Sequence, residues 1–132
     1  MMMKIKVAFS FLIMINVLLL IGCTEDKINQ EENEADIWAA EGMALSYKGN
    51  YSEAIEYFDK VIAIDSNNSF IWANKGLALY EQGKYAEAIE CFDKAIEINP
   101  NYAQAWHYKA DTLYKQLEYS EAMECYEKGI SI

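Results

Sequence analysis

The stretch "SFIWANKGLALYEQGKYAEAIECFDKAIEINPNY", residues 69–102, decides the fold because close copies of it lie on both sides. A shift of 34 residues aligns it with residues 35–68 and with residues 103–132. The shared positions are aromatic or small: Trp38, Trp72 and Trp106; Tyr51, Tyr85 and Tyr119; Ala54, Ala88 and Ala122; Phe58, Phe92 and Tyr126. An internal repeat of this length predicts an array of similar supersecondary units.

Each unit contains two stretches of helical periodicity, such as residues 70–82 and 86–98, joined by a short turn that contains glycine. This pattern predicts an antiparallel helix pair. Small residues lie where the two helices of a pair would cross: Gly42, Gly76, Ala54 and Ala88. Their lack of bulk lets the two backbones approach closely. Gly49 and Gly83 suit the left-handed residue that ends a helix.

The third unit departs from this pattern. Leu117 replaces the turn glycine, and a left-handed conformation costs an ordinary residue about 1–2 kcal/mol, so we expect a different turn there. Gly129 replaces Val61 and Ala95 inside the last helix, at a cost of about 1 kcal/mol. The sequence then ends without a polar terminal helix. This predicts a partly exposed apolar end, self-association through the third unit, or a chain cut short.

The aligned residues resemble the tetratricopeptide repeat (TPR) family from residue 35 onward. Trp lies at the fourth repeat position, Gly or Ala at the eighth, Ala at the twentieth, an aromatic residue at the twenty-fourth and Pro100 at the thirty-second. The resemblance implies an all-α fold, a right-handed superhelix of antiparallel helix pairs with repeats at 35–68, 69–102 and, truncated, 103–132. Proteins of this family usually bind peptides in a concave groove lined by the first helix of each pair.

The family's groove positions imply a peptide site that is aromatic and apolar with few charges. Its candidate residues are Met43, Tyr47, Phe70, Leu77, Tyr80, Glu81, His107, Asp111, Tyr114 and Lys115. Such a mixture is typical of recognition surfaces. The alternative for Met43, Phe70 and Leu77 is that they pack against the neighbouring helix, as an apolar stripe at helical spacing commonly does.

One activity of the family does not fit these residues. TPR domains that hold the carboxylate end of heat-shock chaperones use Lys, Asn and basic residues at five groove positions. This sequence has Ala39, Met43, Asn74, Gln104 and Tyr108 there, and only Asn74 matches. We therefore expect no carboxylate-clamp role.

The N-terminal residues are organised differently. Residues 1–22 have Lys4 and Lys6 followed by an uncharged, mostly apolar run, the layout of a secretory signal peptide. Leu20, Ile21, Gly22 and Cys23 resemble the lipobox of prokaryotic lipoproteins. The resemblance implies cleavage before Cys23, lipid attachment to its sulfur, and an anchor on the extracytoplasmic face of a prokaryotic cell membrane or outer membrane. The alternatives are a short uncleaved membrane anchor, and secretion with Cys23 as a free thiol.

Residues 23–34 are polar and rich in glutamate, so we expect an acidic tether that buries too little surface to fold. The whole chain has a formal charge of −10. Removing residues 1–22 leaves 9 lysines against 21 acids, or −12. This charge argues against a nucleic-acid partner, because phosphate binding requires clustered cations.

Few residues suggest catalysis. The single histidine, His107, has no metal-ligand spacing around it, and no phosphate loop or nucleophile elbow is present, so we expect no enzyme activity, metal or cofactor. Cys91 and Cys125 share a repeat position, which predicts buried thiols about 10 Å apart, too far for a disulfide. Two functions fit: a membrane-anchored module that binds a peptide or protein, or a pilotin-like assembly or scaffold component of an envelope complex.

Overall fold

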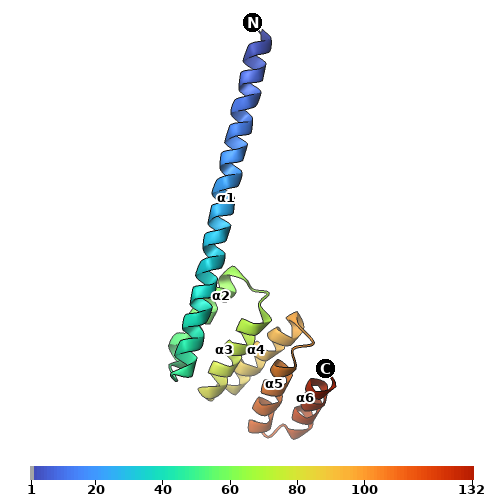
Figure 1. Ribbon diagram of the computed structural model, residues 1–132. Coiled ribbons are helices and arrows are strands. Elements are labelled where there is room, and N and C mark those ends of the chain that lie inside the picture. Colours follow the sequence, from blue (N-terminus) through green and yellow to red (C-terminus); the bar gives the residue numbers. More distant parts are fainter. Residues whose placement is uncertain (1) are drawn as a thin grey trace. The chain divides into compact units, whose positions relative to one another are not determined.

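The computed structural model describes residues 2–132, with side chains from residue 11 onward. The regular structure of this part is entirely helical (Figure 1): α1 (Met2–Tyr47), α2 (Tyr51–Ile64), α3 (Ser69–Glu81), α4 (Tyr85–Ile98), α5 (Ala103–Lys115) and α6 (Tyr119–Ser131). The predicted all-α fold is confirmed. The chain divides into two units at Glu34 and Ala35, and each is described by itself. Lys4 and Lys6 of the predicted leader lie outside the described side chains.

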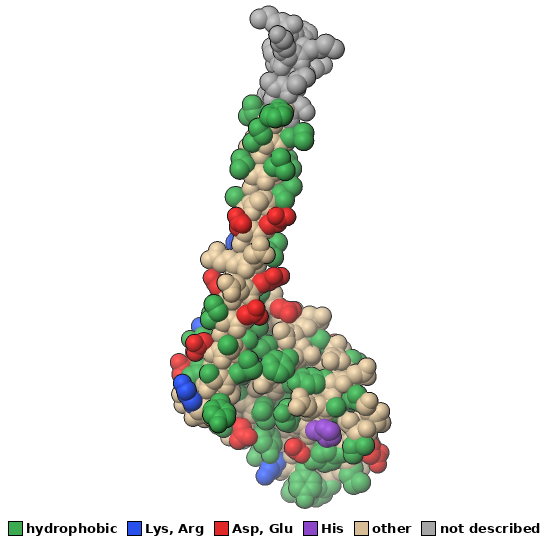
Figure 2. Space-filling model, in the orientation of Figure 1, with side chains coloured by type: hydrophobic (Ala, Val, Ile, Leu, Met, Phe, Trp, Pro, Cys, Tyr) green, Lys and Arg blue, Asp and Glu red, His purple; other side chains and the backbone are tan. Residues whose placement is uncertain are grey.

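The first unit consists of the part of α1 that ends at Glu34. Its residues 11–21 are mainly apolar and all exposed, and Figure 2 shows these side chains around the helix. Cys23 is exposed as well. Within the described residues, no helix combines the length and the apolar character needed to cross a membrane.

The acidic segment, which the sequence predicts to be a tether, is helical. Residues 23–34 form part of α1 although their side chains bury almost no surface. Helix hydrogen bonds join residues four apart within the segment itself. The segment contains neither glycine nor proline, and Glu, Gln and Lys have good helix propensity. The segment therefore contains no local obstacle to a helix, and its side chains are almost entirely exposed.

The second unit contains three helical hairpins in chain order: residues 35–47 of α1 with α2, α3 with α4, and α5 with α6 (Figure 1). The second helix of one hairpin packs on the first helix of the next, α2 against α3 and α4 against α5. The buried clusters cross these boundaries. One of them joins Phe58 and Val61 of α2 to Ile71 and Ala78 of α3. Each repeat thus completes the core of its neighbour, as in other repeat arrays.

The crossing of the paired helices leaves no room for a side chain at two glycines. A Cβ atom on Gly76 would lie 2.6 Å from Cε1 of Phe92, and one on Gly42 would lie 2.7 Å from Cε1 of Phe58. Both phenylalanine rings are fully buried and have little freedom to move. The predicted need for small residues at this crossing is confirmed.

The turn of the third repeat has the same geometry as the other two, so the expectation of a different turn is wrong. Leu117 has a left-handed φ of 66°, close to the 76° of Gly83. Each turn closes with the same backbone bond, from Asn50 N to Leu45 O, from Lys84 N to Leu79 O and from Glu118 N to Leu113 O, at 2.9, 2.9 and 3.0 Å. These bonds satisfy carbonyls at the helix end. Together with hairpin packing, they outweigh the cost of about 1–2 kcal/mol at Leu117.

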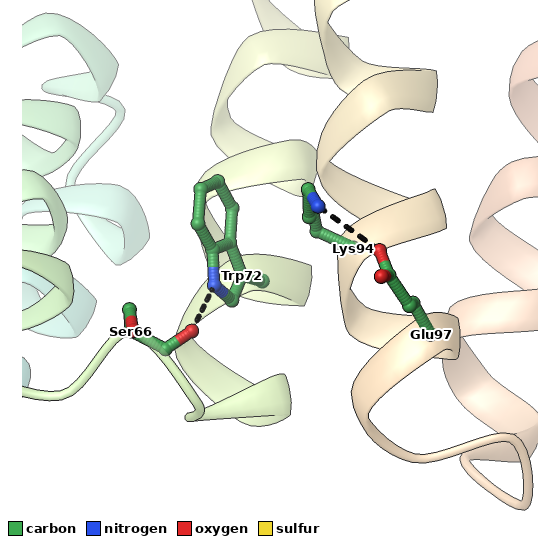
Figure 3. A network of polar contacts seen from close by, with 4 residues as sticks. All are labelled: Ser66, Trp72, Lys94 and Glu97. Atoms are coloured by element: carbon green, nitrogen blue, oxygen red, sulfur yellow. Dashed lines mark hydrogen bonds and ion pairs between the residues drawn. The ribbon is translucent and has the colours of Figure 1, made fainter.

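Tryptophan side chains fix the linkers between repeats. Nε1 of Trp72 donates a hydrogen bond to the carbonyl oxygen of Ser66 at 2.9 Å, and Figure 3 shows the indole nitrogen pointing to this linker. Nε1 of Trp106 donates in the same way to the carbonyl of Pro100, also at 2.9 Å. The linker backbone thereby gains a partner that its own turn does not supply.

The two repeat cysteines are free and buried, as predicted. Burial raises the pKa of the Cys91 thiol to about 11. It also raises the pKa of Cys125. Both side chains therefore behave as small hydrophobic core residues at neutral pH.

Candidate functional site

Two neighbouring hollows lie along the first helices of the repeats. The first has a volume of about 390 Å³ and is lined by Met43, Ser46, Tyr47, Tyr51, Asn74, Leu77, Ala78 and Glu81. The second has a volume of about 180 Å³ and is lined by Leu77, Tyr80, Glu81, Phe92, Tyr108 and Asp111. They share Leu77 and Glu81, so they form one continuous surface, which we call the groove.

Six of the ten predicted groove residues line these hollows: Met43, Tyr47, Leu77, Tyr80, Glu81 and Asp111. Met43 is 37% exposed and Tyr47 is 95% exposed, so both side chains are open to a ligand. Leu77 is half-buried and lines both hollows.

The other four predicted residues do not line the hollows. Phe70 and Tyr114 are exposed, at 47% and 57%, and Lys115 is exposed in the last turn of α5. His107 is half-buried and packs between α5 and α6, with its ring centroid 6.2 Å from that of Tyr126. A Cβ atom on Gly129 would lie only 3.1 Å from Nε2 of His107. The glycine of the last helix therefore provides the space for this imidazole.

Tyrosine pairs lie at equivalent positions of the second and third repeats. The rings of Tyr80 and Tyr85 lie 5.5 Å apart between centroids, and those of Tyr114 and Tyr119 lie 5.0 Å apart. Such tilted or edge-on contacts hold aromatic rings in place. In the first repeat, Ser46 takes the position of Tyr80 and Tyr114. Its buried Oγ has no hydrogen-bond partner among the described residues. The first hollow therefore contains an unused hydroxyl group.

Sequence reasoning missed Tyr51 and Tyr108 as lining residues. Tyr51 lines the first hollow and shares its repeat position with Tyr85, whose ring lies 5.5 Å from that of the groove residue Tyr80. Tyr108 was considered only for the carboxylate clamp, but it lines the second hollow and its ring lies 5.8 Å from that of Phe92. The recurrence of a tyrosine at the start of every second helix was the available signal.

The charges of the groove are negative. Glu81 lines both hollows and Asp111 lines the second, while no lysine lines either one. The hydroxyl of Tyr126 donates a hydrogen bond to Oδ1 of Asp111. This bond, which favours the neutral phenol, raises the pKa of Tyr126 to about 12. The carboxylate of Asp111 is thus held at the edge of the groove.

A further hollow of about 480 Å³ lies over α3 and α4, away from the groove residues. It is lined by Trp72, Lys75, Leu79, Glu87, Glu90, Cys91, Asp93, Lys94 and Glu97. Its lysines already have partners: Lys75 pairs with Asp59 at 2.6 Å, and Lys94 pairs with Glu97 at 3.0 Å (Figure 3). Within the described residues, no group of three or more His, Cys, Asp or Glu side chains could hold a metal ion.

Comparisons with known proteins agree with this architecture. A tetratricopeptide repeat family model matches residues 35–68 and 69–102, and a second tetratricopeptide repeat model matches residues 91–124. No curated protein matches the chain. The TPR domain of Sgt2 from Aspergillus fumigatus is 30% identical with a TM-score of 0.72, and the match covers 74% of this chain and 65% of that one. The chain thus spans slightly less than two thirds of that structure.

Two other similar structures hold peptides or chaperone partners. The second TPR of Spaghetti (RPAP3), bound to the HSP90 peptide SRMEEVD, is 25% identical with a TM-score of 0.72, covering 77% of this chain and 96% of that one. The TPR2B domain of yeast Sti1, in a complex with pHsp70, is 26% identical with a TM-score of 0.71. This match covers 73% of this chain and 77% of that one. The hairpins, their turns and these matches lead to one conclusion: the chain belongs to the tetratricopeptide repeat family.

Proposed function

We propose that this chain is a non-enzymatic interaction module that binds a peptide or protein segment in its groove. The observation that carries the proposal is that Met43 of α1 and Leu77 and Tyr80 of α3 line two hollows. These hollows share Leu77 and Glu81 as lining residues. TPR domains are generally interaction folds without catalytic activity. The peptide-bound RPAP3 and Sti1 structures support this role.

The charge of the groove favours a cationic segment with apolar side chains. Glu81 and Asp111 would attract lysine or arginine, and Tyr80 and Tyr108 offer aromatic faces for cation–π contacts. An acidic C-terminal peptide would meet these carboxylates without the basic residues of a carboxylate clamp. We infer that the ligand class differs from that of the chaperone-binding relatives.

We further propose that the chain is exported and anchored to a prokaryotic cell membrane or outer membrane through lipid on Cys23. The lipobox-like residues 20–23 and the exposed thiol support this anchor. Two acyl chains give stable attachment, because each buried CH₂ contributes about 0.8 kcal/mol. The acidic residues 23–34 would then separate the repeats from the lipid surface. A short uncleaved N-terminal anchor is the alternative.

The groove is tested by crosslinked pull-down with the intact membrane-bound chain. Tyr80→Ala and Glu81→Lys should each reduce recovery of the partner about tenfold, because a buried aromatic contact or a paired charge carries one or more kcal/mol at a hot spot. Glu56→Lys makes the same charge change at an exposed position of α2 outside the groove. Unchanged recovery with both groove variants would refute the groove assignment.

The anchor is tested separately by metabolic labelling with a fatty acid. Cys23→Ser should abolish the label and leave the helical content of the repeats unchanged, because Cys23 is outside the repeat unit. Cys91→Ser is the matched control, since this thiol is buried and should carry no lipid. Continued labelling of the Cys23→Ser chain would mean that the leader has been misinterpreted.

A second role is favoured by an exposed face of the third repeat. Met123 and Ile130 of α6 are 62% and 77% exposed. We propose that this face serves assembly, either within an envelope complex in the manner of a pilotin or with another copy of the chain. The two roles use different surfaces and are compatible.

A further inference from the structure

The outward face of α6 corresponds to the faces of α2 and α4 that receive the next repeat. The 34-residue shift aligns Ile55, Asp59 and Ile62 of α2 with Ile89, Asp93 and Ile96 of α4, and with Met123, Glu127 and Ile130 of α6. Each face is an acidic residue between two large apolar ones. Within the described residues, α2 and α4 therefore provide two occupied examples of this face, and α6 presents it without a partner helix.

The two occupied faces bind their helices with the same contacts. Asp59 forms an ion pair with Lys75 of α3, with 2.6 Å between Oδ1 and Nζ. Asp93 forms one with Lys109 of α5 at the same distance of 2.6 Å. Both lysine side chains are only 21% exposed, so each ammonium group is held against the face. The flanking isoleucines are half-buried among the core clusters that these helices share.

The helices that dock there share a short pattern. Lys75 has Ile71 four residues before it and Ala78 three residues after it, and both are buried. In α5 the same positions hold Ala105 and Thr112, which are fully buried. An apolar residue, a lysine and a small residue on one helical stripe therefore complete this type of face.

The face of α6 is open in the described residues. Among α2 to α5, α6 contacts only α5. No lysine with a described side chain forms an ion pair with Glu127, which is exposed together with Met123 and Ile130. An apolar pair with an acidic centre is thus available on the surface.

We propose that the α6 face docks an amphipathic helix of a partner protein, which places a lysine against Glu127 and apolar side chains against Met123 and Ile130. This proposal rests on the assembly role proposed above and is independent of the groove. The same pairing of a lysine with an acidic residue occurs at both internal interfaces, between α2 and α3 and between α4 and α5. The partner helix needs an apolar residue four positions before its lysine and a small residue three positions after it.

A second copy of the chain fits this face less well than such a helix. In head-to-tail stacking, the first repeat would present Glu41 at the lysine position, opposite Glu127. In a face-to-face pair about a two-fold axis, the Glu127 side chains of both copies would meet, because this residue lies between the two apolar ones. Like charges in direct opposition are unfavourable in both arrangements.

The test uses the chain in lipid nanodiscs and a fluorescent peptide with the sequence of residues 69–82, which is a helix with the required pattern. The peptide should bind with saturable anisotropy, and Met123→Asp should weaken binding at least tenfold. A Lys75→Glu peptide should bind about threefold more weakly, because a partly exposed ion pair contributes up to about 1 kcal/mol. The Glu127→Lys chain should instead bind the Lys75→Glu peptide more tightly than the unchanged peptide.

Two controls separate this proposal from the groove. Glu124→Lys changes an exposed charge of α6 outside the aligned face and should not alter peptide preference. Tyr80→Ala should leave peptide binding intact even if it abolishes partner capture. Absence of saturable binding, or no reversal with Glu127→Lys, would overturn the proposal. Sedimentation that shows a dimer of the wild-type chain, lost with Met123→Asp, would overturn it in favour of a second copy.

Discussion

The second and third repeats build the same hairpin from different residues. Where the second repeat uses Gly83 in its turn, the third uses Leu117, and both are left-handed. Where the second pairs Ala73 with Ala95, the third pairs a half-buried His107 with Gly129. The change at His107 is compensated by the small partner residue Gly129, whereas the change at Leu117 keeps its backbone strain.

The largest difference between the two repeats should appear at their aromatic core residues. Phe92 is fully buried, whereas Tyr126 is half-buried and bonds to Asp111. Phe92→Ala should lower the free energy of unfolding by about 3–5 kcal/mol, because it leaves a cavity between two helices. Tyr126→Ala should cost clearly less. Urea unfolding followed by circular dichroism measures both, and equal losses would contradict the comparison.

The turns provide the next largest effect. Gly83→Leu should destabilise the chain by about 1–2 kcal/mol, because it introduces the left-handed strain that Leu117 already has. A Cβ atom at Gly83 meets open space, so the loss would come from the backbone alone. Leu117→Gly should stabilise by about 1 kcal/mol, since this side chain is 69% exposed and contributes little packing.

Thermal unfolding of these two variants gives a direct comparison, because they exchange residues at one repeat position. A destabilised Leu117→Gly chain would show that the leucine side chain contributes packing that exceeds its backbone strain.

The histidine and glycine of the third repeat should be energetically coupled. Gly129→Ala gains about 1 kcal/mol of helix propensity, but its Cβ would crowd the ring of His107, so the single change should be nearly neutral. In a His107→Ala background the same change should stabilise by about 1 kcal/mol, because the pair then matches the second repeat. A double-mutant cycle measures this coupling, and additive effects would show that the two residues are independent.

The smallest effect concerns the hydroxyl group of Tyr126. Tyr126→Phe should lower stability by less than about 1 kcal/mol, because the lost hydrogen bond to Asp111 is at the surface. The folded pKa of Tyr126 is raised to about 12 from an ordinary value of 10.0. The contribution is therefore fully present below pH 10 and is lost as the pH rises towards 12, where the unfolded chain ionises first.

Unfolding curves of the wild-type and Tyr126→Phe chains at pH 8 and pH 11 test this point. The difference in stability between the two chains should shrink at the higher pH. A difference that stays constant would show that the phenol does not titrate as the hydrogen bond requires.

Much of the repeat architecture could be predicted because it depends on local pattern and residue size. The 34-residue period, the small residues opposite Phe58 and Phe92, and the buried Cys91 and Cys125 follow from sequence alone. The turn at Leu117 could not be predicted, because its local strain is outweighed by the turn's backbone bonds and by packing along the whole hairpin of α5 and α6. The helical form of residues 23–34 could not be predicted from burial, because these side chains bury almost no surface.

The groove was harder to predict than the fold. Repeat positions indicated Tyr80 and Glu81, which line a hollow, but the same rule included His107, which packs against the last helix. That outcome depends on Gly129, a residue on another helix of the same repeat. Position in a repeat defines which side of a helix a residue occupies, whereas its exposure depends on the sizes of its spatial neighbours.

The three aligned tryptophans also give the molecule an optical label for each repeat. Trp38, Trp72 and Trp106 lie at one repeat position, and each indole has a lysine ammonium group 5.0 to 5.7 Å from a ring centroid. Only Trp72 and Trp106 follow a linker whose carbonyl they bind. Chains that keep a single tryptophan would therefore emit from one repeat at a time, so that the order in which the hairpins open could be followed by fluorescence without an added dye.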